Sequence, residues 1–516
     1  MASAKNIHDV LIIGAGVSGI GLATSLKREC PDKKVLILEQ RQAVGGTWDL
    51  FNYPGIRSDS DMFTFSYDFK PWTKSQVLAD GASIKAYVTE TAQQYDIYKD
   101  ISFSRKVLRA NWCAKKGLWE VEVVHLETDK AEQYSTRFLF FCTGYYRYEA
   151  GYRPVFKDEE TFQGEIIHAQ LWPKDFDYSE KKVVVVGSGA TAITLVPNMV
   201  DKAAKVTMLQ RSPTYIMSIP ASDKIAEKFQ KILPEKLAYR LNRNRNIIFQ
   251  RKLYQICQKY PKLMRSFLLK QARLQLGGKV DMRYFTPRYL PWEQRLCFVP
   301  NGDLFKAIRT GKADIVTDHI DSFDRDGIRL KSGEFIEADL VVLATGLKIQ
   351  LLGGMTLSMD GKEVQVSDRM LYKGTLIEGV PNAALMFGYI NSSWTLKVNL
   401  AAQYFCRLLK YMDKNDKQTF TPIDSDSNQE DGSFVDNLAA GYIQREAHSI
   451  PRQGKTGNWR VWHDYFKDLS LLTKEPVEDK ELLFSAIPIK FISNRKKQKP
   501  MLGEHSDQNN LVRFKG

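Results

Sequence analysis

The clearest pattern along the chain is an uninterrupted apolar run that ends in a glycine-rich turn. Residues 10–13 form such a run, the turn GAGVSG follows, and a second apolar run, VLIL, ends before Glu39. A continuous short apolar run predicts a strand that is buried on both faces, and the residues after the turn have helical composition. Residues 10–39 therefore predict a strand, a helix and a second strand.

The same pattern occurs again near the middle of the chain. Residues 181–200 (KKVVVVGSGATAITLVPNMV) place glycines at 187 and 189 and Ala192 at the third position of the turn. Two further apolar runs, 138–142 and 340–343, each end before a Thr-Gly turn. We therefore expect an α/β fold with two doubly wound, Rossmann-like nucleotide-binding domains.

A basic segment follows the second unit. Its apolar residues Leu253, Cys257 and Tyr260 recur at helical spacing, and the pattern restarts at Met264 after Pro261, so we expect a helical insertion. The chain carries a formal charge of +14, and residues 221–280 hold fifteen Lys or Arg against three acids. Peripheral membrane contact through 221–280 is one hypothesis. No DNA- or RNA-recognition signature accompanies the segment, and we expect no nucleic-acid partner.

Composition narrows the class of protein further. With 516 residues, 43% hydrophobic and 26% charged, the chain is expected to form two or three globular domains. Its six cysteines lie far apart without a CxxC pair, which predicts neither a disulfide framework nor a structural metal site. The same absence disfavours a dithiol reductase. We expect no metal and a reducing, cytoplasmic location.

The first glycine turn has the spacing of a dinucleotide site. In G-x-G-x-x-G, Gly14 permits the tight turn, Gly16 lets the backbone approach a pyrophosphate, and Gly19 packs the helix on the strand. Glu39 ends the next strand, where a carboxylate can accept hydrogen bonds from both ribose hydroxyls. This site suits FAD or NAD, and a glycine turn without a ligand is the alternative.

The second turn differs at the position that corresponds to Glu39. The sequence there is Gln210-Arg211-Ser212, which offers a guanidinium and a hydroxyl in place of an acid. A 2′-phosphate needs cationic donors and is repelled by a carboxylate, so this site suits NADPH. The alternative is that Arg211 is a solvated surface charge.

Two longer motifs carry a resemblance to a known family. GGTWDLFNYPGIRSD (45–59) fits (A/G)GxWxxxx(F/Y)P(G/M)xxxD, and FQGEIIHAQLWP (162–173) fits FxGxxxHxxxWP. Both resemble signatures of Baeyer–Villiger monooxygenases, and the chain is most similar to the branch that contains the ethionamide-activating monooxygenase. The likeness covers most of the chain, through QRSPTY, PWEQRLCFVPNGDLF and ATGL.

The resemblance implies a reaction. NADPH reduces FAD, O2 converts the reduced flavin to a C4a-peroxyflavin, and a ketone becomes an ester or lactone; sulfides or thioamides are further expected substrates. The alternative is a flavin-dependent oxygenase that acts on sulfur or nitrogen only, which the WP ending of 162–173 disfavours. The expected partners are thus O2 and a small ketone or sulfur-containing molecule.

The resemblance assigns the catalytic roles to Arg295 in PWEQRL and to Asp59. A fixed cation stabilises developing negative charge, and a neighbouring carboxylate orients it through charge-assisted hydrogen bonds. A loop salt bridge for Arg295 and a turn or helix cap for Asp59 are the structural alternatives, and Arg288 is a rival cation. Many relatives carry Lys or Arg where this chain has Gln294, which leaves its strictness for NADPH over NADH open.

Matching residue by residue extends the implied sites. Besides Gly14, Gly16 and Gly19, the FAD contacts are Ser18, Glu39, Thr47, Trp48, Asp49, Leu50, Asp59 and Val107. The NADP contacts are Arg57, Ser58, Asp59, Gly187, Ser188, Gly189, Ala190, Thr191, Ala192, Gln210, Arg211 and Ser212. The resemblance places Phe162, Gly164, His168 and Trp172 on the linker between the two nucleotide domains and implies that the histidine serves domain rotation, so we expect no proton transfer by His168. Trp394 and Met355 are candidates for a substrate pocket or for the core.

These assignments predict a discontinuous domain order. An FAD-binding domain is expected from residues 1–150 and 346–490, and an NADPH-binding domain from 151–216 and 291–345. The basic helical insertion takes 217–290. Residues 491–516 are expected to form a basic, loosely ordered tail.

Overall fold

The first apolar run forms a strand at the centre of a mixed sheet. The computed structural model describes residues 7–435 and 441–486, and in it β1 (Ile7–Ile13) pairs in parallel with β2 (Val35–Leu38) and β6 (Lys130–Phe141). Val10 and Ile12 point into one hydrophobic core, whereas Leu11 and Ile13 point into the core on the opposite face. Because both faces are covered there, the strand is apolar at every position from Val10 to Ile13.

Eleven strands form this sheet within the described residues. The order β18-β17-β4-β5-β6-β1-β2-β3 forms the main path, and β21 joins β6 and carries β20 and β19. The remaining strands are β3 (Ile101–Ser102), β4 (Arg105–Cys113), β5 (Leu118–His125), β17 (Thr356–Met359), β18 (Lys362–Glu363), β19 (Leu371–Tyr372), β20 (Leu376–Ile377) and β21 (Ala383–Leu385). Residues before 142 and after 355 thus build one sheet.

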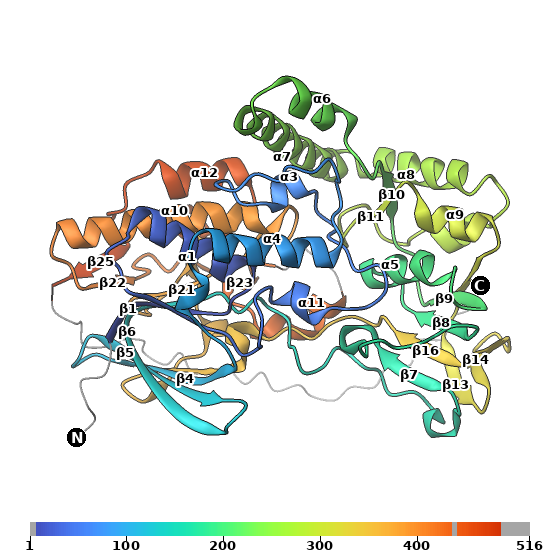
Figure 1. The fold of residues 1–516 in the computed structure, drawn as a ribbon, viewed down its shortest axis with the longest axis horizontal. Coiled ribbons are helices and arrows are strands. Elements are labelled where there is room, and N and C mark those ends of the chain that lie inside the picture. The colour runs from blue at the N-terminus through green and yellow to red at the C-terminus, as the bar shows by residue number, and fades with distance from the viewer. Residues whose placement is uncertain (1–6, 436–440, 487–516) are drawn as a thin grey trace, which may run out of the picture.

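Helices cover one face of this sheet, on the left in Figure 1. They are α1 (Val17–Glu29), α4 (Gly81–Gln94), α10 (Trp394–Lys414) and α12 (Tyr465–Thr473), with the short α2 (Thr47–Leu50), α3 (Met62–Phe65) and α11 (Gly441–Glu446) in the connections. Two small antiparallel pairs complete the C-terminal part: β22 (Thr419–Pro422) with β25 (Leu482–Ser485), and β23 (Gln429–Ser433) with β24 (Arg452–Gly454).

The second lobe contains a five-stranded parallel sheet in the order β12-β9-β8-β16-β7. Its strands are β7 (Glu165–His168), β8 (Lys182–Val186), β9 (Lys205–Gln210), β12 (Ala313–Thr317) and β16 (Leu340–Leu343), and α5 (Ala190–Met199) and α9 (Asp303–Arg309) pack on it. A parallel pair, β10 (Ile216–Ile219) with β11 (Cys297–Pro300), and the antiparallel β13 (Ile320–Asp324), β14 (Gly327–Leu330) and β15 (Phe335–Glu337) complete it. The predicted fold class is confirmed.

The basic segment forms three helices that lie above both lobes (Figure 1). They are α6 (Lys224–Ile232), α7 (Glu235–Lys259) and α8 (Pro261–Gln275). Pro261 begins α8 two residues after α7 ends, because proline fits the first turn of a helix but not its interior. Helix α7 contacts α3 of the first lobe, and α8 contacts β10 and α9 of the second, so the insertion connects the two.

None of the helices in the described part of the chain combines the length and the apolar character needed to cross a bilayer. The predicted tail, 491–516, lies outside the described residues. The predicted domain boundaries themselves stay predictions.

Candidate active site

The carboxyl ends of the parallel strands in both sheets face a shared cavity of about 1020 Å³. Both glycine turns line it, and so do the loop 56–60 and the segment 294–298. Ligands of open α/β sheets bind beyond the carboxyl ends of the strands, which is where this cavity lies. One continuous space can therefore hold two nucleotides with their reactive ends close together.

The first turn needs glycine at the positions that the spacing predicts. Gly14 has a φ of +102°, and a Cβ there would lie 2.6 Å from the carbonyl oxygen of Cys142. A Cβ at Gly19 would lie 1.9 Å from the carbonyl oxygen of Gly14. Helix α1 begins without a side-chain cap at Gly16, so its first N–H groups are left for an anion in the cavity.

The motif GGTW packs directly against this turn. The N–H of Gly45 donates to the carbonyl of Ala15 at 3.1 Å, and a Cβ at Gly46 would lie 3.0 Å from the Cα of Gly16. Two glycines in a row allow this close backbone approach. The motif thereby places Thr47 and Trp48 on the cavity wall.

The second glycine turn has the same features as the first. Gly187 has a φ of +146°, and a Cβ there would lie 2.4 Å from the carbonyl oxygen of Ala344. Helix α5 begins at Gly189, again without a side-chain cap, and a Cβ at Gly189 would meet no atom within 4 Å. The open space beside Gly189 is a cradle that a phosphate group fits.

Glu39 and Arg211 give the two turns opposite charge. The Glu39 carboxylate is buried and accepts hydrogen bonds from the N–H groups of Ala15 (2.6 Å) and Arg41 (2.9 Å). Burial raises its pKa, and these hydrogen bonds oppose that shift. Arg211 and Ser212 are exposed on the cavity wall. Arg445 of α11 lines the same cavity, close enough for its charge to interact with that of Arg211.

The guanidinium of Arg57 lies on the cavity wall, where it can bind a ligand. Its Nη1 lies 2.9 Å from the carboxylate of Asp303, whereas its Nη2 is buried without a hydrogen-bond partner among the described residues. Burial raises the pKa of Asp303, and the nearby Arg57 guanidinium opposes this shift. A buried guanidinium nitrogen without a partner fits a ligand oxygen that completes the site.

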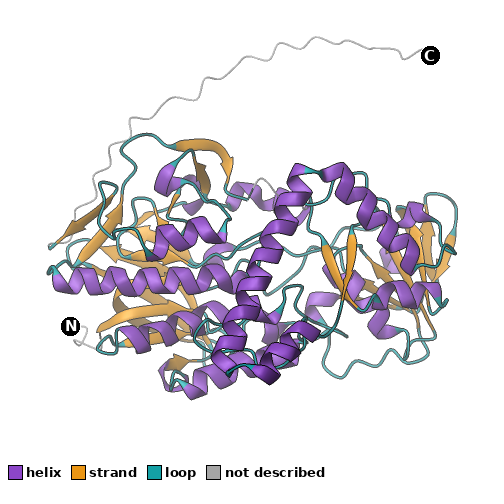
Figure 2. Ribbon diagram, turned by 90° about the horizontal axis from the view of Figure 1, so that it is seen from above, coloured by secondary structure: helices purple, strands orange, loops and turns teal. Residues whose placement is uncertain are grey.

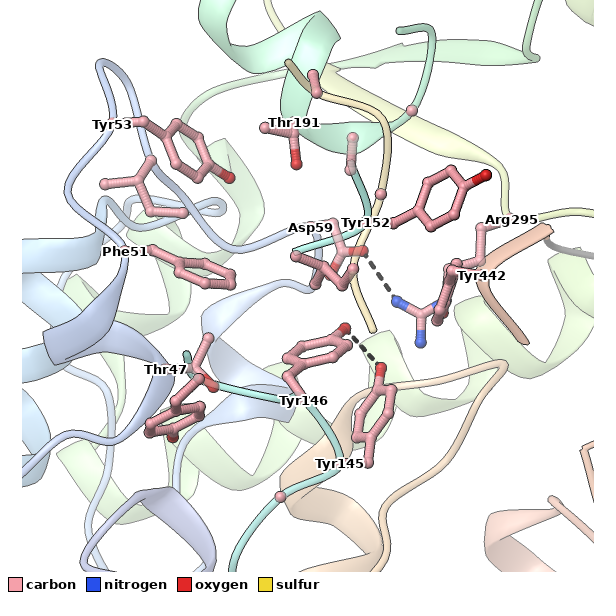
Figure 3. A pocket seen from close by; sticks show the side chains of 18 of the residues that line it. Thr47, Phe51, Tyr53, Asp59, Tyr145, Tyr146, Tyr152, Thr191, Arg295 and Tyr442 are labelled. Atoms are coloured by element: carbon pink, nitrogen blue, oxygen red, sulfur yellow. Dashed lines mark hydrogen bonds and ion pairs between the residues drawn. The ribbon is translucent and has the colours of Figure 1, made fainter. Parts of the chain in front are cut away.

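The two residues expected to be catalytic lie together. Nη1 of Arg295 donates to the Asp59 carboxylate at 3.3 Å, and both side chains line the cavity (Figure 3). Arg295 precedes β11, and Asp59 lies in the loop between α2 and α3. Arg288, the rival cation, is exposed and is not among the described residues that line the cavity. The geometry therefore favours Arg295 over Arg288 as the cation of the site.

Three tyrosines surround this guanidinium (Figure 3). Burial lowers the pKa of Arg295, but Tyr442, Tyr145 and the Asp59 carboxylate outweigh it and hold the pKa well above its ordinary value. The hydroxyls of Tyr145 and Tyr146 lie 2.6 Å apart. Arg295 is therefore a fixed cation at every physiological pH.

Trp394 connects this cluster to the first glycine turn. Its Nε1 donates to the Ser18 hydroxyl at 2.9 Å, and its ring stacks on Tyr145 with centroids 5.3 Å apart. Trp394 begins α10 and lines the cavity, as does Met355. The side chain of Ser18 thus has a protein partner in addition to its place on the cavity wall.

Other expected contact residues are engaged elsewhere. The Asp49 carboxylate pairs with Arg41 and Lys85, each at 2.6 Å. The amide of Gln210 is buried and donates to Tyr284 and Thr317. Asp49, Leu50, Ala192 and Gln210 are not among the described residues that line the cavity, whereas Val107 and Ser188 to Thr191 are.

The motif 162–173 braces the connection between the lobes. His168 ends β7, its Nδ1 accepts from the N–H of Gln170 at 3.2 Å, and a Cβ at Gly151 would overlap its ring. The Gln170 amide donates to the carbonyls of Arg147 (2.7 Å) and Tyr148 (3.1 Å). Burial lowers the pKa of His168, and it is not among the described residues that line the cavity. This placement argues against a role in proton transfer.

The remaining motif residues pack within the second lobe. Phe162 contacts Phe323, with ring centroids 5.6 Å apart, and Trp172 contacts Phe176 and Tyr178 edge to face. A Cβ at Gly164 would lie 2.5 Å from the carbonyl oxygen of Asp339.

The reasoning from sequence missed Tyr145, Tyr146, Tyr442 and Arg445. The first two directly follow the Thr143-Gly144 turn, so their place at the end of β6 was a signal that could have indicated them. Tyr442 and Arg445 belong to α11, which follows Arg295 by about 150 residues in the sequence. No local pattern indicates that α11 lies near Arg295.

Comparison with known proteins identifies the class. Residues 7–418 match the family described as Flavin-binding monooxygenase-like. The chain is 52% identical over 482 residues to MymA of Mycobacterium tuberculosis, described as an FAD-containing monooxygenase, covering 93% of this chain and 97% of that protein. It is 47% identical to the FAD-containing monooxygenase EthA of the same species, covering 93% and 98%.

A solved structure of oxidized steroid monooxygenase bound to NADP matches with a TM-score of 0.75 at 20% identity, over 93% of this chain and 99% of that one. This likeness shows the fold. The protein belongs to the flavin-binding monooxygenase-like family, and the predicted class of enzyme, a flavin monooxygenase, is confirmed.

Proposed function

We propose that the protein binds FAD at the first glycine turn and NADPH at the second, and uses O2 to convert ketones to esters or lactones. The observation that carries the proposal is the Arg295–Asp59 pair, which lies in the same cavity as both turns. The reaction consumes one ketone, one O2, one NADPH and one proton, and yields one ester, one NADP+ and one water.

The residues present fit both cofactors. Uncapped helix N-termini at Gly16 and Gly189 offer N–H groups to a pyrophosphate. Glu39 would accept from the ribose of FAD, and Arg211 would donate to the 2′-phosphate of NADPH. When bound, FAD supplies the activation of O2 and the transfer of one oxygen atom, and NADPH supplies the electrons.

Arg295 would stabilise negative charge next to the flavin. Its pKa lies well above the ordinary value, so the guanidinium keeps its charge and does not donate its proton to a neighbouring anion. The Asp59 carboxylate orients the guanidinium through the hydrogen bond from Nη1, and the neighbouring tyrosines lie close enough to affect its pKa. A charged group that needs no reorganisation is the arrangement that lowers a barrier most.

The test is product analysis of the purified, flavin-loaded enzyme with NADPH and 18O2. A linear ketone, a cyclic ketone and an aryl methyl sulfide are supplied separately. The proposal predicts an ester or lactone that carries one 18O atom, with one NADPH consumed per product, and it predicts sulfoxide from the sulfide. Sulfoxide without any ester would instead establish an oxygenase restricted to sulfur and nitrogen.

A further inference from the structure

Exposed apolar side chains concentrate on the helical insertion. The described residues include 22 large hydrophobic side chains that are exposed, and half of them lie between residues 225 and 274. They are Ile225, Ile232, Leu237, Leu241, Ile248, Phe249, Ile256, Tyr260, Leu263, Phe267 and Leu274. Exposed apolar side chains that gather on one part of a folded protein indicate an interaction surface.

The exposed residues form stripes along the helices. On α8, Leu263 (65% exposed) and Leu274 (69% exposed) are eleven residues apart, which is three helical turns, and Phe267 lies between them. On α7, Leu237, Leu241 and Ile248 follow the same spacing. The opposite faces, with residues such as Leu253 and Leu268, are buried against the body. The stripes therefore point away from the protein.

Lysines share these stripes. Lys252 and Lys259 follow Ile248 by four and eleven residues, and Lys270 follows Leu263 by seven, so each lies on an apolar stripe. Among the described residues, no carboxylate lies within ion-pair distance of these three lysines. In the part of the chain that the structure describes, Arg245, which pairs with Asp223, and Arg251, which pairs with Asp464, are the basic residues of 221–280 within ion-pair distance of a carboxylate, so most of the local charge is unpaired.

Buried hydrogen bonds anchor α7 to the first lobe. Arg243 of α7 is buried, and its Nη1 donates to the carbonyls of Phe63 (2.8 Å) and Ser66 (2.9 Å). Figures 1 and 2 show α6, α7 and α8 together on one face of the molecule, where they lie nearest the viewer in Figure 2.

We propose that the exposed faces of α6, α7 and α8, the lipid face, dock on an anionic phospholipid bilayer. Lysines within an apolar stripe match the two layers of such a surface, since the ammonium groups contact headgroup phosphates while the apolar side chains enter the acyl boundary. A protein partner would need carboxylates dispersed among apolar residues in the same pattern. The charge of the lipid face favours the phosphates of a bilayer.

The test is co-sedimentation of the purified, full-length, flavin-loaded protein with vesicles. One set contains phosphatidylcholine alone, and the other contains phosphatidylcholine with phosphatidylglycerol. We expect binding to the anionic vesicles that weakens steeply as salt rises, and weak binding to the neutral ones.

Two double variants separate the charge from the apolar contribution. Lys252→Gln with Lys259→Gln should weaken binding to anionic vesicles roughly 25-fold, from about fivefold per lysine. Leu263→Ser with Leu274→Ser should weaken it about tenfold or more. The matched controls are Lys115→Gln with Lys362→Gln, and Leu126→Ser with Leu483→Ser, at exposed positions away from these helices. The absorbance of bound flavin reports that each variant is folded.

Three results would overturn the proposal: no binding to anionic vesicles, binding that salt does not weaken, or binding that neither double variant of the lipid face changes. Sedimentation velocity without vesicles distinguishes a competing occupant. Self-association that the same variants abolish, without vesicle binding, would assign the lipid face to a second copy of the chain. None of these readouts depends on the proposed ketone oxygenation.

Discussion

Replacing Gly189 by alanine tests whether the second glycine turn binds a pyrophosphate. Its φ of −80° and ψ of −174° are extended values that alanine also adopts, and a Cβ there meets no atom within 4 Å. Gly189→Ala should therefore fold without strain. We expect its free energy of unfolding to differ from that of the unchanged protein by less than about 0.5 kcal/mol.

The effect on the nucleotide should be large. The added methyl group takes the space in which the second glycine of such a turn lets a pyrophosphate approach. Overpacking of this kind costs about 1 to 3 kcal/mol, which corresponds to a roughly 5- to 150-fold rise in the Kd for NADP+. The content of FAD should not change, because Gly189 belongs to the second lobe.

The assay is calorimetric titration with NADP+, which binds without turnover, alongside the ratio of flavin to protein absorbance. Gly187→Ala is the contrasting variant. It forces a methyl group at a φ of +146° to within 2.4 Å of the Ala344 carbonyl oxygen, so it should lower the stability itself. If Gly189→Ala binds NADP+ as tightly as the unchanged protein, the placement of NADPH at this turn is wrong.

Three further predictions concern charge. Arg211→Gln should raise the KM for NADPH roughly 10- to 150-fold and leave that for NADH nearly unchanged, since only NADPH carries the 2′-phosphate; an equal rise for both would refute the assignment. Gln294→Lys adds a cation to the cavity wall and should increase the preference for NADPH over NADH, measured as the ratio of kcat/KM values. Burial lowers the pKa of His463 to about 4 from 6.5, so the unfolded chain binds a proton more readily and stability, full above pH 6.5, falls as the pH falls toward 4. Urea denaturation at pH 7 and pH 4.5 measures how much the free energy of unfolding changes with pH. His463→Gln should reduce this change by about 2 to 3 kcal/mol, and an equal change in both proteins would contradict the prediction.

The elements of the fold that depend on neighbouring residues could be predicted from the sequence. The two glycine turns could be predicted from their own spacing between a strand and a helix. The contacts that require glycine at Gly14 and Gly187 come from the distant residues Cys142 and Ala344, and the structure was needed to find them. Pro261 likewise separates two helices by its own chemistry.

Features that depend on distant contacts could not be predicted. Tyr442 of α11 lies near Arg295, and the Gln210 amide donates to Tyr284 and Thr317. Neither contact can be inferred from the residues adjacent in the sequence. The charge of 221–280 was visible in the sequence. Which apolar residues of that segment remain exposed became clear only once the buried face of α7 and α8 was known.

The most direct test of the central claim compares Arg295→Ala with Arg288→Ala. Three quantities are measured in each: NADPH oxidised, ester formed and hydrogen peroxide released. The account predicts that Arg295→Ala still oxidises NADPH but forms ester roughly 100- to 1000-fold more slowly, with hydrogen peroxide in its place, whereas Arg288→Ala keeps its ester yield. Ester formation by Arg295→Ala at the normal ratio to NADPH would contradict the role of this guanidinium.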